Sequence, residues 1–189
     1  MDYRILVCGG NGSGKSTIGK ELAKRLSCKF MDIEDYYFNK ENIEKDIKND
    51  NESNKDYKYK KSKTKEEVIN NLLEDMRNNN SFVMSAVTAD YGSKVKSFFN
   101  LIIMLEVDTK TRMKRVYDRS YKMFGDRVKQ DGDLFESEKL FFKKAEEKDN
   151  EYVRKWANTL NCDKLFLDGT KEISENIDII LNNLKEKEN

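Results

Sequence analysis

The chain has 189 residues, 38% of them charged, and its 36 basic and 35 acidic residues leave a formal charge of +1. This length is typical of one domain, and the near-neutral charge excludes a general attraction to nucleic acid or to an anionic membrane. Because the sequence has no histidine, a Ser-His-Asp triad, a Cys-His pair and a His-ligated zinc or haem are excluded. The cysteines Cys8, Cys28 and Cys162 are widely spaced, so we expect reduced thiols and a cytoplasmic protein.

Short apolar runs alternate with amphipathic stretches along the chain, which is the pattern of an α/β protein. Strands are expected at 5–8, 30–33, 82–87, 101–107 and 165–167. Helices are expected at 15–27, 64–76 (opened by a Thr64–Glu67 capping box), from 109, at 134–160 and at 171–184. Strand–helix alternation predicts a three-layer sandwich around a five-stranded parallel sheet. The aromatic residues of the 134–160 helix are interpreted as core packing.

Residues 1–189 are expected to form a single domain with two peripheral segments. Residues 39–63 are rich in Lys, Asn, Asp and Glu and are interpreted as a solvated insertion between the second and third expected strands. Residues 120–133 are the second segment. The longest apolar run, 101–105, is too short to cross a membrane, so no membrane partner is expected.

A glycine-rich segment, GGNGSGKS at 9–16, follows the first expected strand and opens the first expected helix. It matches the phosphate-binding loop G-x-x-x-x-G-K-[ST] at every position. Glycines let consecutive backbone N–H groups turn towards an anion, and the helix N-terminus adds partial positive charge. Lys15 would pair with the β- and γ-phosphates and Ser16 would ligate Mg²⁺. The nucleotide-binding residues expected here are Gly9, Asn11, Gly12, Ser13, Gly14, Lys15, Ser16 and Thr17.

This loop, followed by FMDIED at 30–35, resembles the small P-loop kinases related to shikimate, gluconate and adenylate kinases. It resembles more closely a set of bacterial kinases labelled generically as AAA-family ATPases. The resemblance covers nearly the whole chain except 39–63 and implies ATP and Mg²⁺ as cofactors. In those kinases an acid at the end of the second strand lies beside the γ-phosphate and the metal. Asp32 matches that acid, and Glu34 or Asp35 matches the acid that meets the acceptor.

The same acidic residues would also fit a solvated strand end or a helix cap. Asp90 is a further candidate acid facing the acceptor, and it fits a turn equally well. The third expected strand leads to Ser85 rather than to an acid, which agrees with a metal ligand on the second strand. The residues alone do not choose between Asp32, Glu34, Asp35 and Asp90 as the base.

Residues 110–129 carry eight Lys or Arg and two Asp, a local charge of +6. Arg115 and Arg119 lie four residues apart, so both would reach one anion from a single helix face. The resemblance to adenylate and shikimate kinases implies that residues 120–133 form a lid and that Arg115, Arg119 and Arg127 close over the nucleotide. It also implies that the 39–63 insertion lies on the substrate side. The alternative is a solvated basic helix face, and an RNA-binding use of this segment is the weaker reading because no recognised module accompanies it.

Residues 168–170 follow the last expected strand and resemble the adenylate-kinase segment that packs near the adenine. Asp168, Gly169 and Thr170 are therefore expected to contact the nucleotide, although a glycine turn with a Thr cap explains them equally well.

The expected function is transfer of the γ-phosphate of Mg-ATP to a small-molecule acceptor, either a sugar or polyol acid or a nucleoside or nucleotide. The alternative is an ATP-binding regulatory protein with slow ATP hydrolysis. The sequence does not indicate the acceptor, the preference for ATP over another nucleotide or the oligomeric state. The expected catalytic residues are Lys15, Asp35, Glu34, Arg119 and Arg115, and the expected metal ligands are Ser16 and Asp32.

Overall fold

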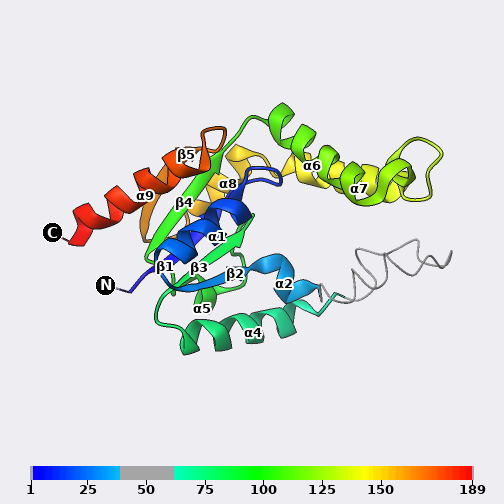
Figure 1. Ribbon diagram of the computed structural model, residues 1–189. Helices are drawn as coiled ribbons and strands as arrows, with labels where there is room; N and C mark the ends of the chain where they lie inside the picture. The colour runs from blue at the N-terminus through cyan, green and yellow to red at the C-terminus, as the bar shows by residue number, and fades with distance from the viewer. Residues whose placement is uncertain (1, 39–61, 189) are drawn as a thin grey trace.

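The computed structural model describes residues 2–38 and 62–188, and it has a five-stranded parallel sheet between layers of helices (Figure 1). The strands are β1 (Arg4–Cys8), β2 (Lys29–Asp32), β3 (Phe82–Ala86), β4 (Leu101–Glu106) and β5 (Asp163–Asp168). They lie in the order β2-β3-β1-β4-β5, and each neighbouring pair is parallel. The α/β prediction is confirmed, and the strand that leads into the glycine-rich loop lies at the centre of the sheet.

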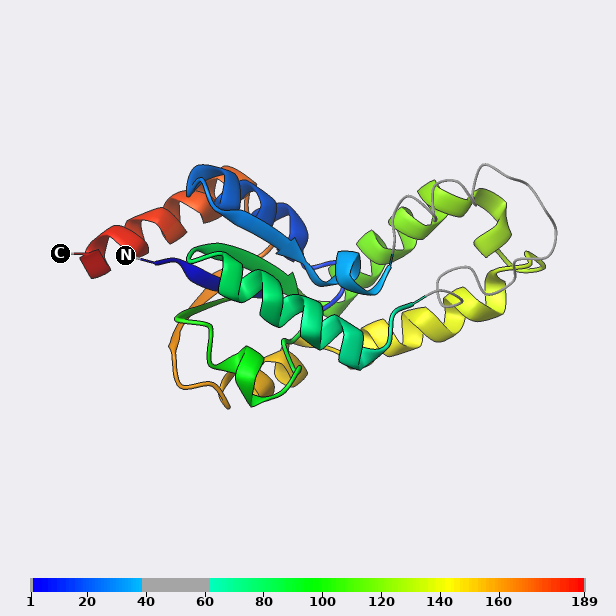
Figure 2. The same cartoon turned by 90° about the horizontal axis from the view of Figure 1, so that it is seen from below.

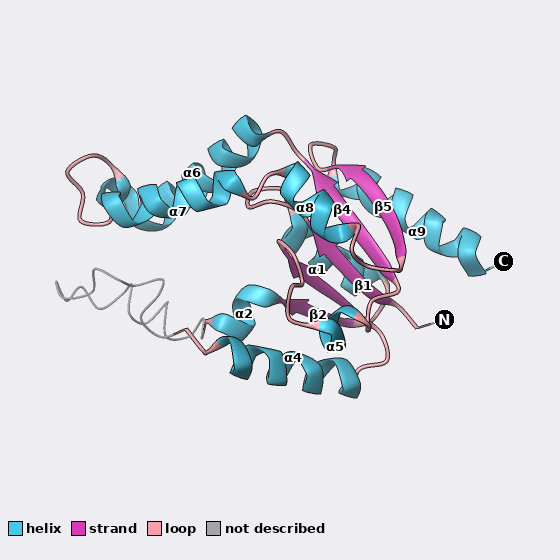
Figure 3. Ribbon diagram, turned by 180° about the vertical axis from the view of Figure 1, so that it is seen from behind, coloured by secondary structure: helices cyan, strands magenta, loops and turns pink. Residues whose placement is uncertain are grey.

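Helices cover both faces of this sheet (Figures 1 and 3). One face carries α1 (Lys15–Arg25) and α9 (Ile173–Glu188), and the other carries α4 (Lys65–Asn78), α5 (Ser93–Lys96) and α8 (Asn150–Ala157). Side chains alternate between the faces as they must on a strand. On β1, Ile5 and Val7 join the core under α1 and α9, whereas Leu6 and Cys8 join the core under α4 and α8. The three-layer prediction is confirmed.

Two local details concern the ends of elements. The Thr64 capping box is present, because the Thr64 hydroxyl accepts from the Glu67 N–H and the Glu67 carboxylate accepts from the Thr64 N–H. The second strand ends one residue earlier than predicted. Its last residue, Asp32, caps a short helix, α2 (Ile33–Tyr37), by accepting from the Glu34 N–H at 3.1 Å.

The single helix predicted at 134–160 is wrong. The structure has α7 (Phe135–Glu147) and then α8, separated by Lys148, whose ψ of 61° lies outside the helical region. Asp149 restarts the chain as an N-cap, accepting from the Tyr152 N–H at 2.8 Å. The apolar pattern runs on through this break, so periodicity alone did not reveal it.

Helix α7 packs against α6 (Thr109–Phe124), and with the short η1 (Gly125–Val128) they form an arm, residues 109–147, that projects from the sheet (Figure 2). A buried hydrogen bond of 2.6 Å from Ser120 to Glu138 joins the two helices, and the rings of Tyr117 and Phe142 lie 5.9 Å apart. The prediction that the aromatic residues here belong to the core is therefore only partly correct. Tyr152 of α8, for example, is 47% exposed.

The expected insertion at 39–63 lies outside the described residues except for its last two positions. At the start of the second described range, the Lys63 N–H donates to the Tyr37 carbonyl at 3.1 Å. The expected lid, 120–133, occupies the outer end of the arm. Across 2–38 and 62–188, none of the helices combines the length and the apolar character that crossing a membrane requires.

Candidate functional site

The loop between β1 and α1 wraps closely against the start of the arm. Gly12 has φ of +82°, and a Cβ at this position would lie 2.4 Å from the Arg112 carbonyl oxygen. Only glycine fits such a conformation and such an approach. Beyond the loop, Ile18 makes the first helical hydrogen bond of α1, to the Gly14 carbonyl. The N–H groups of Lys15, Ser16 and Thr17 are therefore left without helix partners, as an anion site requires.

Lys15 is the central cation of this loop and is only 9% exposed. Burial lowers its pKa, and the nearby positive charge of Arg119 acts in the same direction. The carboxylates of Glu34 and Asp32 act in the opposite direction. Within the described part of the chain Lys15 forms no ion pair, so its charge is available to an anionic ligand.

The acidic end of β2 lies beside the loop. Asp32 is in register with Ser85 of β3, and the Ser85 hydroxyl is 3.4 Å from the Ser16 hydroxyl. The predicted metal ligands Asp32 and Ser16 therefore both lie next to Ser85, at the carboxyl end of the sheet. Their oxygen atoms suit Mg²⁺, which in such sites takes one or two protein ligands together with phosphate oxygens. Among the described residues no group of three or more His, Cys, Asp or Glu side chains offers a metal site of its own.

Arg115, Arg119 and Arg127 of the arm lie in three different environments. The Arg115 guanidinium donates to the carbonyls of Gly12 and Gly169, at 3.3 and 3.2 Å, and so joins the phosphate loop to the β5–α9 turn. Arg119 is exposed, makes no hydrogen bond or ion pair with the residues described, and lies near enough to Lys15 to lower its pKa. Arg127 points elsewhere, because it forms a double hydrogen bond with Asp133 at 3.0 and 2.7 Å.

Arg112 is a site residue that the sequence analysis missed. It is fully buried, and it donates to the carbonyls of Asn11 and Ala145, at 3.1 and 3.3 Å. It therefore joins the phosphate loop to the end of α7. In the sequence it is one of eight basic residues of the 110–129 segment, and nothing local separates it from the solvated ones.

The 168–170 turn lies against the phosphate loop. A Cβ on Gly169 would come within 2.8 Å of the Ser13 carbonyl, so only glycine permits this packing. Asp168 accepts from the N–H and hydroxyl of Thr170, at 2.8 and 2.6 Å. These two bonds hold the pKa of Asp168 below its ordinary value. The glycine turn is therefore present, but Thr170 is not the cap of α9, which begins at Ile173. Contact of these residues with a nucleotide stays a prediction.

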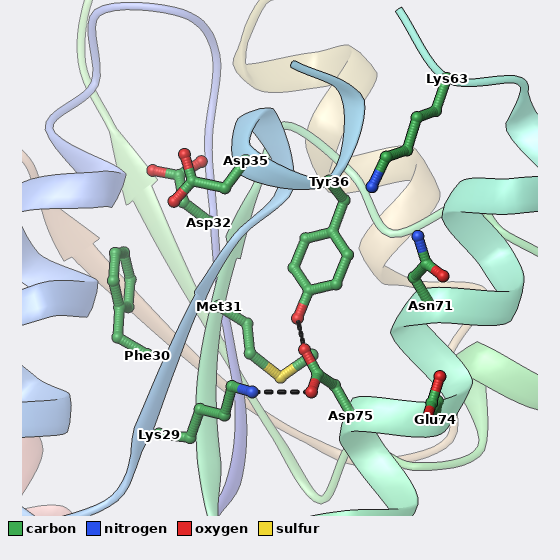
Figure 4. Close-up of a pocket in the computed structure, with 10 residues that line it drawn as sticks. All are labelled: Lys29, Phe30, Met31, Asp32, Asp35, Tyr36, Lys63, Asn71, Glu74 and Asp75. Atoms are coloured by element: carbon green, nitrogen blue, oxygen red, sulfur yellow. Dashed lines mark hydrogen bonds and ion pairs between the residues drawn. The ribbon is translucent and has the colours of Figure 1, made fainter. Parts of the chain in front are cut away.

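A cavity of about 520 Å³ opens at the same end of β2, between β2, α2 and α4 (Figure 4). Its described lining comprises Lys29, Phe30, Met31, Asp32, Asp35, Tyr36, Lys63, Asn71, Glu74 and Asp75. Asp75 accepts from the Tyr36 hydroxyl and, at 2.7 Å, from the Lys29 ammonium. Burial opposes it, but these two hydrogen bonds hold the pKa of Asp75 below its ordinary value. The pKa of Tyr36 is raised by burial and by its bond to Asp75.

Asp90 takes no part in this arrangement. It is an exposed residue of the β3–α5 connection, and its carboxylate pairs with Lys96 at 2.6 Å. The hydrogen bond from Lys96 lowers its pKa. Of the two interpretations of Asp90, the surface turn agrees with this geometry.

A family model described as an AAA domain matches residues 5–133. The chain belongs to the AAA domain family. The uncharacterized protein YqaC of Bacillus subtilis is 25% identical to this AAA-domain protein over 192 residues, which cover 97% of the chain and 98% of the relative. A probable gluconokinase of Dictyostelium discoideum is 29% identical over 126 residues, 64% of the chain and 62% of the relative.

A solved structure of deoxyadenosine kinase from M. mycoides with bound dATP matches this AAA-domain protein with a TM-score of 0.56. The match covers 97% of the chain and 100% of that structure at 16% identity, so it shows a shared fold. The resemblance to small P-loop kinases is confirmed at this level.

Proposed function

We propose that the protein is an Mg-ATP-dependent phosphotransferase that moves the γ-phosphate of ATP to a hydroxyl group of a small-molecule acceptor. The observation that carries the proposal is the position of Asp32. It lies near enough to Lys15 to affect the Lys15 pKa, and it also lines the cavity between β2 and α4. A phosphate chain held by the loop would therefore end where the cavity begins.

The roles of the residues follow from their positions. Lys15 and the N–H groups of the first turn of α1 would hold the β- and γ-phosphates, and Arg119 would approach the transferring group from the arm. Bound Mg²⁺, held by Ser16, Asp32 and phosphate oxygens, would neutralise charge on the phosphates. Arg115 would position the loop through the two carbonyls it already contacts.

In the transfer itself, the acceptor oxygen would form a bond to the γ-phosphorus while the bond to the β,γ-bridging oxygen breaks. The acceptor proton would pass to a carboxylate, for which Asp35 is the best-placed candidate because it lines the cavity beside Asp32 (Figure 4). Of the carboxylates that raise the pKa of Lys15, Glu34 has the largest effect. We assign Glu34 to the phosphate side of the site.

The comparisons support a kinase of this general type. One relative is a probable gluconokinase, and one structural neighbour is a deoxyadenosine kinase. A gluconokinase is named for a sugar acid and a deoxyadenosine kinase for a nucleoside. Both names support a small hydroxylated acceptor.

The test is to incubate the protein with γ-labelled ATP, Mg²⁺ and a pool of small metabolites and to look for a labelled product other than phosphate. We expect one class of compound to raise ATP turnover many-fold and to become labelled. Lys15→Ala should abolish the transfer, whereas Lys20→Ala, an exposed lysine on the same helix, should retain it. Turnover that stays equally slow with every compound would instead indicate a regulatory ATPase.

A further inference from the structure

The phosphate loop lies where the arm leaves the body (Figure 1), and Arg112 of α6 packs against it. The Arg112 side chain is fully buried and forms no ion pair with the residues that the structure describes. Burial lowers its pKa, against the opposing effect of the carboxylates of Asp149, Asp108 and Glu146. Its Nε–H is also buried and has no acceptor in this part of the chain. A desolvated cation with an unsatisfied donor costs stability, so the reason for an arginine here lies in binding rather than in folding.

The Arg112 guanidinium holds three segments together. Nη1 donates to the Asn11 carbonyl at 3.1 Å and to the Ala145 carbonyl at 3.3 Å, and Nη2 lies 3.5 Å from the Thr109 hydroxyl. The loop leaves room for this group, because a Cβ on Gly10 would lie 2.4 Å from Nη1. The Asn11 carbonyl is therefore fixed by a side chain that neither the loop nor α1 supplies.

Fixing this carbonyl also fixes one N–H of the loop. The Asn11 carbonyl and the Gly12 N–H belong to the same peptide unit, which is planar and trans, so the two groups point in opposite directions. The Gly12 N–H is thus turned away from Arg112. It has no acceptor among the residues described, and Gly12 is partly exposed. An unpaired backbone N–H in a glycine-rich loop is a donor for a phosphate oxygen.

Arg115 does not have this effect, although it too donates to a carbonyl of the loop. It contacts the Gly12 carbonyl, and the N–H of that peptide unit belongs to Ser13. The Ser13 N–H already donates to the Gly10 carbonyl at 3.1 Å, within the loop. Of the two arginines, Arg112 is therefore the one whose contact leaves a backbone donor available to a ligand.

We infer that Arg112 is a positioning residue for nucleotide binding, which holds the Asn11–Gly12 peptide so that the Gly12 N–H is presented to the phosphates. The inference rests on the nucleotide-binding step of the proposed function and is independent of the acceptor. A competing account is that Arg112 acts through its charge alone, which lies near enough to Lys15 to lower the pKa of that lysine. The two accounts differ for a lysine substituted at this position, because its ammonium group keeps the charge but ends short of the position of Nη1.

The experiment measures the binding of Mg-ATP and of inorganic tripolyphosphate by calorimetry, in the wild-type protein, Arg112→Met and Arg112→Lys. We expect Arg112→Met to raise the dissociation constant about ten-fold for both ligands, because they share the phosphate chain that the Gly12 N–H would contact. Arg112→Lys should remain at least about three-fold weaker than the wild type for both. The control is Lys114→Met, which removes an exposed charge from the same helix and should leave both constants within about two-fold.

Urea denaturation of the same variants separates a role in binding from a role in stability. If Arg112→Met is less stable but binds both ligands like the wild type, Arg112 is a structural residue only and the inference is overturned. Full recovery of affinity in Arg112→Lys would assign the effect to charge, and a loss confined to Mg-ATP would assign it to the nucleoside, so either result also overturns it. If Arg112→Met does not fold, Arg112→Lys carries the same comparison. A wild-type protein that binds neither ligand would contradict the proposed function itself, and this inference with it.

Discussion

The positive charge of Lys15 contributes little to the stability of the unliganded protein. Its ammonium group is buried, it has no ion-pair partner among the residues described, and its lowered pKa records the desolvation. The position makes sense for a group whose partner is a ligand. Stability is given up at a binding site in return for affinity.

The first prediction follows from this arrangement. Lys15→Met should increase the free energy of unfolding of the unliganded protein by about 0.5–2 kcal/mol, because an apolar side chain of similar length replaces a desolvated cation. It should also eliminate ATP binding. Urea denaturation measures the first effect and titration with ATP the second.

The pH dependence gives an independent check on Lys15. Its folded pKa is lowered, so as pH rises towards the ordinary lysine value the unfolded chain holds the extra proton and the stability of the wild-type protein increases. Lys15→Met should lack this increase and Lys20→Met should keep it. A wild-type protein whose stability gained nothing from this group over that range would contradict the desolvated position.

Asp75 supports the second prediction. Its pKa is depressed in the folded protein, so its stabilising effect is present above the ordinary aspartate pKa and is lost as pH falls through the folded value. Asp75→Asn should therefore lower stability by about 1–3 kcal/mol near neutral pH and by progressively less below about pH 4. Denaturation curves from pH 3 to pH 7 test this. The neighbouring exposed Glu74→Gln, which should change stability by less than about 0.5 kcal/mol, is the control.

At the scale of elements, the features that a short stretch of sequence encodes were predicted correctly. The β-branched apolar runs gave the five strands, and the glycine-rich loop and the Thr64 capping box each lie in a single short segment. Features that depend on contacts between distant segments were missed. Arg112 meets Asn11 across 101 positions, and Tyr36 meets Asp75 across 39. The spacing of residues along the sequence does not predict such contacts, because they form only through tertiary packing.

The break between α7 and α8 is the clearest case, and it supports the third prediction. Asp149 caps α8, which contributes Val153 and Ala157 to the core. Asp149→Ala should lower the free energy of unfolding by about 0.5–2 kcal/mol, because the first N–H groups of α8 lose their acceptor. Glu151→Ala lies in the same turn, and among the residues described Glu151 pairs only with exposed Lys155, so this change should alter it by less than about 0.5 kcal/mol. Equal effects in chemical denaturation would show that the cap is not used.

At the scale of the whole molecule, the protein consists of a packed three-layer body and an arm that reaches away from it (Figure 2). Arg112 and Arg115 attach the base of the arm to the phosphate loop through backbone carbonyls. These contacts hold the base of α6 against the phosphate loop, and Arg119 of the same helix lies near enough to Lys15 to lower its pKa. The body thus supplies the phosphate loop, and the arm supplies the cation above it.

The fourth prediction tests this division and depends on the proposed activity. Arg119→Ala should lower kcat by about 10²–10³-fold, since it removes a cation aimed at the transferring phosphate, with little change in stability. Arg127→Ala, which breaks the pair with Asp133 at the end of the arm, should leave kcat nearly unchanged. Steady-state kinetics of both variants, with thermal denaturation alongside, measure this. A comparable loss of kcat in Arg127→Ala would mean that the outer part of the arm closes over the nucleotide.

The position of Trp156 on α8 has a practical consequence. It is the single tryptophan of the chain, it packs against the core between the sheet and α8, and the Lys96 ammonium lies 6.0 Å from its ring. Intrinsic fluorescence excited at the indole band therefore comes from one layer of the body. Its emission therefore reports the unfolding of the layer that contains α4, α5 and α8. A denaturation curve followed by this fluorescence measures the stability of the body of the protein rather than that of the arm.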